Sequence, residues 1–161
     1  MGPDGDALMA VELTNETQHP VDEARLISVA QAAMASMRID PEAELSISVV
    51  DDETMSALHA EWMDEEGPTD VLSFPMDELT PGVPGGPLST GMLGDIVIAP
   101  AFATAAAQLA GRDPLAELDL LMVHGVLHLL GFDHADLDEE REMFALQDQI
   151  LADHRSGGVP A

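Results

Sequence analysis

The segment from about Leu115 to Leu130 constrains the fold most, because its pattern is helical and it is apolar on nearly every side from Leu120 onward. Asp113 and Pro114 supply an N-cap and a first-turn proline, and Gly131 stands where a left-handed turn would end the helix. A helix that is apolar all round is stable only when other elements cover it. We therefore expect this helix to lie buried at the centre of the fold.

Three histidines lie within and just after this helix: His124, His128 and His134. Residues four apart share a helical face, so His124 and His128 can offer ring nitrogens to one ion, and a turn at Gly131 can return His134 to the same point. Three imidazoles plus an open position are typical of catalytic zinc, whereas structural zinc sites usually contain cysteine, which this chain lacks. The spacing predicts one zinc ion held by the three histidines; the alternative is three hydrogen-bonded core residues. We expect ordinary surface or core roles for His19, His59 and His154.

Hydrolysis is the reaction class that such a site favours, because zinc lowers the pKa of its bound water to about 7. The spacing also matches the H-E-x-x-H-x-x-G-x-x-H pattern of metzincin peptidases except at Gly125, where those enzymes have their general base. A peptidase mechanism is therefore disfavoured. Asp133 is a candidate base or a turn-capping residue, and Asp70 and Asp95 are weaker candidates, so the catalytic base stays unassigned.

The composition indicates one globular domain with an unusually acidic surface. Of 161 residues, 46% are hydrophobic and 22% charged, which argues against disorder. We expect flexible tails at residues 1–8 and 155–161 and a single metallohydrolase domain over residues 9–154. The net charge of −26, with five arginines and no lysine, opposes broad nonspecific binding to nucleic acid.

The apolar runs are too short to cross a membrane and the N-terminus lacks a signal-peptide pattern. With no cysteine for disulfides, a cytoplasmic location is expected, with no membrane partner and no DNA.

Strand and helix patterns interleave early in the chain, and helices accumulate late. Strands are predicted at 9–15, 45–49, 71–74 and 93–98, and helices at 21–37, from 51 or 52 to 62, 100–111, 115–130 and 138–153. In the second helix, Met55, Leu58, His59 and Trp62 share one face, which we expect to be packed. A loop with many prolines and glycines spans 77–91, a length that is uncommon unless the loop is functional or mobile. The predicted fold class is α/β: a small four-stranded mixed sheet covered by helices, with the histidine helix buried at its centre.

Three ordered motifs give the chain a family resemblance over roughly residues 9 to 154. These are the histidine segment 124–134, Pro-Thr-Asp-Val-Leu-Ser-Phe at 68–74 and Leu-Gly-Asp-Ile-Val at 93–97, with Glu142-Met143 also fitting. Together they resemble the YbeY family of bacterial endoribonucleases and ribosomal RNA maturation factors, particularly its actinobacterial members. One departure is Met63, where many members have an arginine.

The resemblance implies a zinc-dependent endoribonuclease specific for single-stranded RNA. Such an enzyme would trim the end of small-subunit ribosomal RNA and take part in ribosome quality control, with ribosome-associated proteins as further partners. The family's metal ligands correspond to His124, His128 and His134. Two alternatives stay open: a metzincin-like peptidase or other metal-dependent hydrolase, and a non-catalytic ribosome assembly factor with a structural metal.

Overall fold

The computed structural model describes residues 10–63, 70–133 and 136–156. Its strands are β1 (Val11–Asn15), β2 (Glu44–Val49), β3 (Val71–Pro75) and β4 (Met92–Ile98). Its helices are α2 (Glu23–Ser36), α3 (Asp52–Met63), α4 (Pro100–Leu109), α5 (Pro114–Leu129) and α6 (Leu137–Arg155). The predicted tail at 1–8 lies outside the described residues, and Arg155, predicted to begin the second tail, is the last residue of α6.

The four strands form one open mixed sheet in the order β1-β2-β4-β3. β1, β2 and β4 run parallel, and β3 pairs antiparallel with β4 at one edge. The predicted four-stranded mixed sheet is therefore confirmed. In β2 the exposed and buried residues alternate, as expected for a strand with one face against the core.

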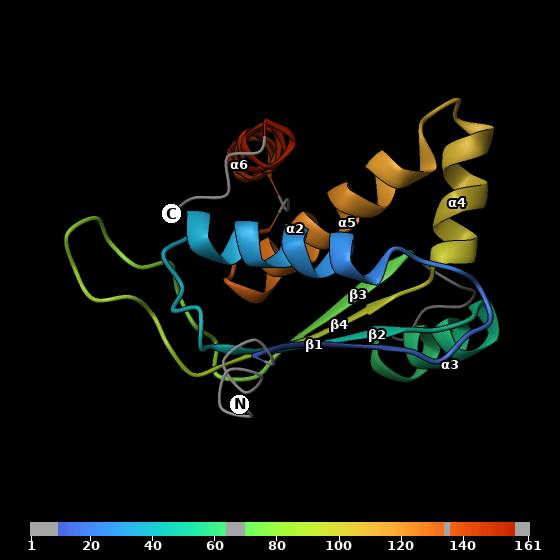
Figure 1. The fold of residues 1–161 in the computed structure, drawn as a ribbon, viewed down its shortest axis with the longest axis horizontal. Helices are drawn as coiled ribbons and strands as arrows, with labels where there is room; N and C mark the ends of the chain where they lie inside the picture. Colours follow the sequence, from blue (N-terminus) through green and yellow to red (C-terminus); the bar gives the residue numbers. More distant parts are fainter. Residues whose placement is uncertain (1–9, 64–69, 134–135, 157–161) are drawn as a thin grey trace.

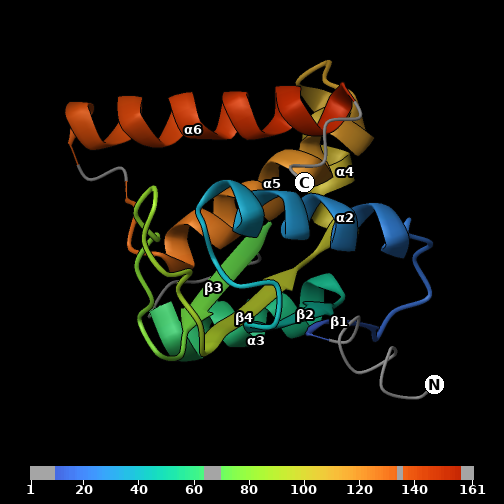
Figure 2. The same cartoon turned by 60° about the vertical axis from the view of Figure 1, so that its left-hand side comes forward.

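Helices cover the two faces of the sheet unequally (Figures 1 and 2). α2 and α5 pack on one face, with α6 outside them, and their apolar side chains join those of the sheet in the main core. α3 lies on the opposite face, where Met55 and Leu72 belong to a smaller apolar cluster. The sheet and helices thus sandwich α5, as predicted for a helix apolar on nearly every side.

Helix starts follow the capping residues of the sequence. The side chains of Asp22, Asp51, Asp113 and Asp136 each accept a hydrogen bond from a backbone N–H in the first turn, at 2.8–3.1 Å. At Asp51, this bond from Thr54 holds the pKa of the carboxyl below its usual value.

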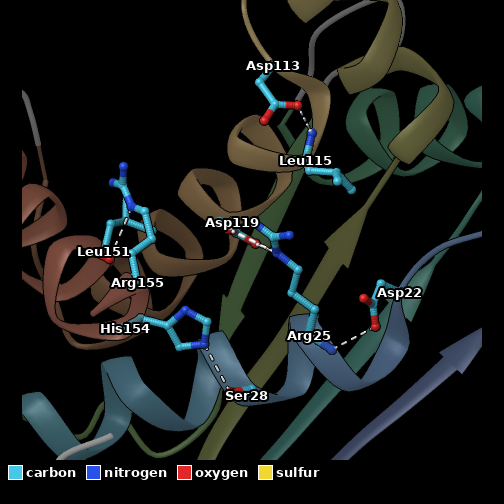
Figure 3. A network of polar contacts seen from close by, with 9 residues as sticks. All are labelled: Asp22, Arg25, Ser28, Asp113, Leu115, Asp119, Leu151, His154 and Arg155. Carbon is cyan, nitrogen blue, oxygen red and sulfur yellow. Dashed lines mark hydrogen bonds and ion pairs between the residues drawn. The ribbon is translucent and has the colours of Figure 1, made fainter. Parts of the chain in front are cut away.

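Polar contacts join α2 to α5 and to α6 (Figure 3). Arg25 of α2 forms a two-pronged salt bridge with Asp119 of α5, with a shortest distance of 2.7 Å between Nη2 and Oδ2. Asp119 is only 4% exposed, and its hydrogen bonds raise the pKa of Arg25 above the usual value. His154 of α6 lies 3.0 Å from the hydroxyl of Ser28, measured from Nε2 to Oγ. This residue therefore has the structural role expected of it.

The loop at 77–91 is held against the rest of the molecule. The Asp77 carboxylate accepts a hydrogen bond from the backbone N–H of Met92 at 2.7 Å, and the N–H of Gly82 donates to the carbonyl of Met37 at 3.0 Å. Ser89 forms an isolated parallel β-bridge with Ile39, which lies just after α2. The loop is thereby placed beside the C-terminal end of α5, where it lines the candidate site.

Candidate active site

α5 is buried at every position from Leu121 to Leu130 except two, His124 and His128. Both histidines are half-buried, so the helix opens toward solvent only where its imidazoles stand. Asp113 and Pro114 start the helix as predicted, because Asp113 accepts a hydrogen bond from the N–H of Leu115 and proline needs no donor in the first turn. The apolar helix therefore holds a pair of polar rings rigidly at its surface.

The two imidazole rings converge on one point. The Nε2 atoms of His124 and His128 are 2.8 Å apart, and the rings meet edge to face with centroids 4.4 Å apart. This arrangement follows from their spacing of four residues. Two nitrogens this close lie within reach of one ion at the usual zinc–nitrogen distance of about 2.0–2.1 Å.

Gln147 of α6 fixes the orientation of one ring. Its Oε1 lies 2.6 Å from Nδ1 of His124, and its side chain is buried, with 4% of its surface exposed. A carbonyl oxygen only accepts, so Nδ1 carries the proton and the neutral ring keeps its lone pair on Nε2, the atom that faces His128. The sequence predicts the helix at 138–153, which contains Gln147, but no role for this residue; the only signal is one amide among apolar neighbours such as Met143 and Ile150.

Gly131 makes the left-handed turn that the sequence predicts, with φ of +94°. The N–H of Gly131 donates to the carbonyl of His128, and that of Phe132 to the carbonyl of Leu127, which closes the helix end. His134 lies outside the described residues. Within 10–63, 70–133 and 136–156, no three His, Cys, Asp or Glu side chains are grouped to hold a metal, so the three-histidine site stays a prediction.

Gly125 lies where α5 crosses the sheet. A Cβ built on it would stand 3.1–3.3 Å from three side-chain atoms of Ile96 on β4, and the Ser73 hydroxyl of β3 donates to its carbonyl at 3.2 Å. The helix approaches the strands closely because this residue has no side chain. A glutamate at this position, as in metzincin peptidases, would have to displace Ile96 or lift the helix.

Two grooves open at the C-terminal end of α5. One, of about 160 Å³, lies between His128 and the loop; its lining comprises Pro75, Glu78, Leu79, Thr80, His128, Leu129, Leu130 and Gly131. The other, of about 180 Å³, has an acidic wall; its lining comprises Pro81, Leu130, Gly131, Phe132, Asp133, Glu139 and Glu142. The negative charge of Asp136 raises the pKa of the exposed Glu139. Carboxylates thus surround the end of the histidine helix.

The structure separates the candidate bases. Asp133 lies in the acidic groove, whereas Asp95 is on the opposite face of the sheet, because its neighbour Ile96 points toward α5. Asp70 precedes β3 and its backbone carbonyl accepts a hydrogen bond from Ala99. The sheet therefore removes Asp95 from the histidines. The Met63 side chain lies outside the part of the chain that is described.

Comparison with known proteins identifies the family. The family model described as "Endoribonuclease YbeY" matches residues 12–155. This chain belongs to the YbeY family. It is 52% identical over 147 residues to the YbeY endoribonuclease of Thermobifida fusca, covering 91% of this chain and 95% of that one. It is 54% identical over 160 residues to the one from Acidothermus cellulolyticus, covering 94% and 98%. Membership confirms the predicted enzyme class, a hydrolytic endoribonuclease, and the predicted actinobacterial kinship.

A solved structure supports the fold. The solution structure of TM1509 from Thermotoga maritima matches with a TM-score of 0.61 at 20% identity, covering 94% of this chain and 95% of that one. At this identity the match concerns the fold alone. In the described part of this YbeY-family chain, no helix is long and apolar enough to cross a membrane.

Proposed function

We propose that this chain is a zinc-dependent endoribonuclease that cleaves single-stranded RNA and trims the end of small-subunit ribosomal RNA. The single observation that carries the proposal is the convergence of the His124 and His128 Nε2 atoms, 2.8 Å apart, beside a groove. Family membership supports the reaction. Ribosome quality control, a cytoplasmic location and ribosome-associated protein partners belong to the same proposal.

His124 and His128 would hold the zinc, with His134, outside the described residues, as the third ligand. The donor set fits, since half-buried neutral imidazoles suit zinc and the chain has no thiolate to close a structural site. A bound zinc would supply a Lewis acid for a phosphate oxygen and an acidified water.

Side chains of the protein would orient the metal ligands and accept the proton released during hydrolysis. Gln147 keeps the His124 lone pair directed at the site, because its Oε1 accepts the Nδ1 proton. Asp133 and Glu142 line the acidic groove at the end of α5, and we take them as the candidates to accept a proton during hydrolysis. The same carboxylates repel phosphate, which disfavours a path of the RNA backbone along the acidic groove.

Metal analysis and RNA cleavage by wild type and His124→Ala test the proposal. Wild type is expected to bind about one zinc ion and cut single-stranded RNA, and the variant to lose both, because it loses a ligand. Leu109→Ala is the matched control, since Leu109 is 91% exposed on α4. Equal zinc content in wild type and His124→Ala would refute the site.

The two alternatives predict different results in the same experiment. A peptidase would digest casein and leave RNA intact, although this chain has Gly125 in place of the usual glutamate base and a side chain there would press on Ile96. An assembly factor with a structural metal would bind zinc without turnover, and chelation would unfold it.

A further inference from the structure

A third groove, of about 550 Å³, lies on the face of the sheet opposite α5. Its lining comprises Ser48, Trp62, Phe74, Pro75, Asp95 and Val97. α3 covers only part of this face, and its last turn supplies Trp62. The histidine site does not use this groove.

Trp62 is the unusual member of the lining. It shares a helical face with Met55, and the sequence predicts packing, yet 61% of Trp62 is exposed whereas Met55 is fully buried. The indole contacts Phe74 of β3 edge to face, with centroids 5.9 Å apart and planes at 68°. Most of the indole surface is therefore open to solvent, and an exposed aromatic ring is the kind of surface on which unpaired bases stack.

Asp95 gives the groove a polar wall. Its side chain is half-buried, and among the described residues no side chain or backbone N–H donates a hydrogen bond to its carboxylate. Among the described residues that line it there is no arginine, so none of them offers a guanidinium to a phosphate. A carboxylate beside an aromatic face instead suits the N–H groups on the edge of a base.

The groove and the candidate active site adjoin at one residue. Pro75, the last residue of the edge strand β3, lines both this groove and the one that contains His128. A strand of RNA bound at the histidines would therefore have to cross the end of β3 to reach Trp62.

We propose that this groove binds one unpaired base of the RNA substrate, stacked on Trp62 with its N–H edge donating to Asp95. The inference rests on the proposed RNA-cleaving function and adds a base-binding subsite to it. Guanine fits best, because N1–H and the N2 amino group can both donate to one carboxylate, whereas uracil has only N3–H. Stacking needs no cation, which suits a chain with five arginines and no lysine.

Tryptophan fluorescence tests the subsite directly, because Trp62 is the only tryptophan and the chain has no tyrosine. The zinc-loaded full chain is titrated with short single-stranded oligonucleotides of guanine-rich or uracil-rich sequence that carry 2′-O-methyl groups and phosphorothioate linkages to prevent cleavage. Binding is followed in parallel by the anisotropy of a labelled oligonucleotide. We expect saturable quenching of Trp62 that tracks the anisotropy, with tighter binding of the guanine-rich strand.

Variants separate stacking from edge recognition. Trp62→Ala should weaken binding about 5- to 150-fold, and Trp62→Phe much less, because a ring remains. Asp95→Asn should remove most of the preference for guanine over uracil while leaving binding of the uracil-rich strand unchanged. Both side chains lie outside the main core, and Leu109→Ala is again the control.

The outcomes distinguish this subsite from the proposed function. RNA binding with unchanged Trp62 fluorescence, or with wild-type affinity in Trp62→Ala, would overturn the subsite and leave the endoribonuclease proposal standing. No RNA binding by wild type with or without zinc would overturn both. Quenching that is the same for guanine-rich and uracil-rich strands and insensitive to Asp95→Asn would overturn the role of Asp95.

Discussion

Gln147 shows how one buried amide can set the state of a site on another helix. Because it accepts the Nδ1 proton of His124, Gln147→Leu should lower zinc affinity about 10- to 100-fold with little change in shape. Competition with a coloured chelator measures the affinity. Gln108→Leu, at an exposed position on α4, is the matched control. Equal zinc affinity in Gln147→Leu and wild type would show that the amide does not orient the ring.

Arg25 and Asp119 form a pair whose two halves are unequally buried. Side-chain exposure is 35% for Arg25 and 6% for Asp119. Arg25→Met should cost about 2–3 kcal/mol of unfolding free energy, because it strands a buried carboxylate, with some relief from partial solvation. Asp119→Asn should cost about 1–2 kcal/mol, since the guanidinium can turn toward solvent. Urea unfolding measures both; a larger loss for Asp119→Asn would contradict this account.

Gly94 controls the junction between the sheet and α5. Its φ of +144° suits glycine, and a Cβ there would collide with the Phe74 carbonyl and press on Leu129 of α5. Gly94→Ala should therefore lower the unfolding free energy by about 3 kcal/mol or more. Gly85→Ala is the control: its φ is +80° with open space around it, so only about 1 kcal/mol should be lost. Similar losses in thermal or urea unfolding would exclude the predicted collision.

The elements themselves were largely predictable, because their signals are local. Period, caps and breakers placed α5 at about 115–130, and the structure has it at 114–129. The left-handed turn at Gly131 was also predicted from the sequence and is confirmed. The order β1-β2-β4-β3 was not predicted, since strand pairing depends on contacts far apart in the chain.

The candidate site was predictable in part. The spacing of four residues indicated that His124 and His128 meet, and they do. Helical periodicity also placed Trp62 on an apolar face, which was predicted to be packed. That prediction was wrong for the indole, which is 61% exposed, because periodicity does not show whether the sheet extends far enough to cover the last turn of α3. The hydrogen bond between Gln147 and His124 could not be predicted, because an amide on a helix has many possible partners and only the packing of α6 on α5 determines which one it meets.

The net charge of the molecule determines how its affinity for RNA depends on ionic strength. With a net charge of −26, long-range repulsion should dominate at low ionic strength. Raising sodium chloride from about 20 mM to about 200 mM shortens the Debye length from roughly 20 Å to below 10 Å, so RNA affinity should rise about threefold or more. Lysine-rich RNA-binding proteins behave oppositely, because salt weakens their phosphate contacts.

Anisotropy titrations across that salt range measure the effect. A charge-reduced variant with Asp52→Asn, Glu53→Gln, Asp148→Asn and Asp153→Asn, all exposed and away from both grooves, should respond less to salt. Affinity that falls steadily with salt in both proteins would show that phosphate contacts govern binding.

The close crossing at Gly125 and Ile96 also bears on how this scaffold could evolve. A single substitution that introduced a glutamate at 125 would damage the packing before it could contribute new chemistry. Ile96 would first have to be replaced by a smaller residue, and that substitution alone leaves a cavity and adds no activity. A variant that carries only one of these two substitutions is therefore expected to be less stable than the present chain. The packing that supports the histidines thus also disfavours the evolution of a peptidase from this site.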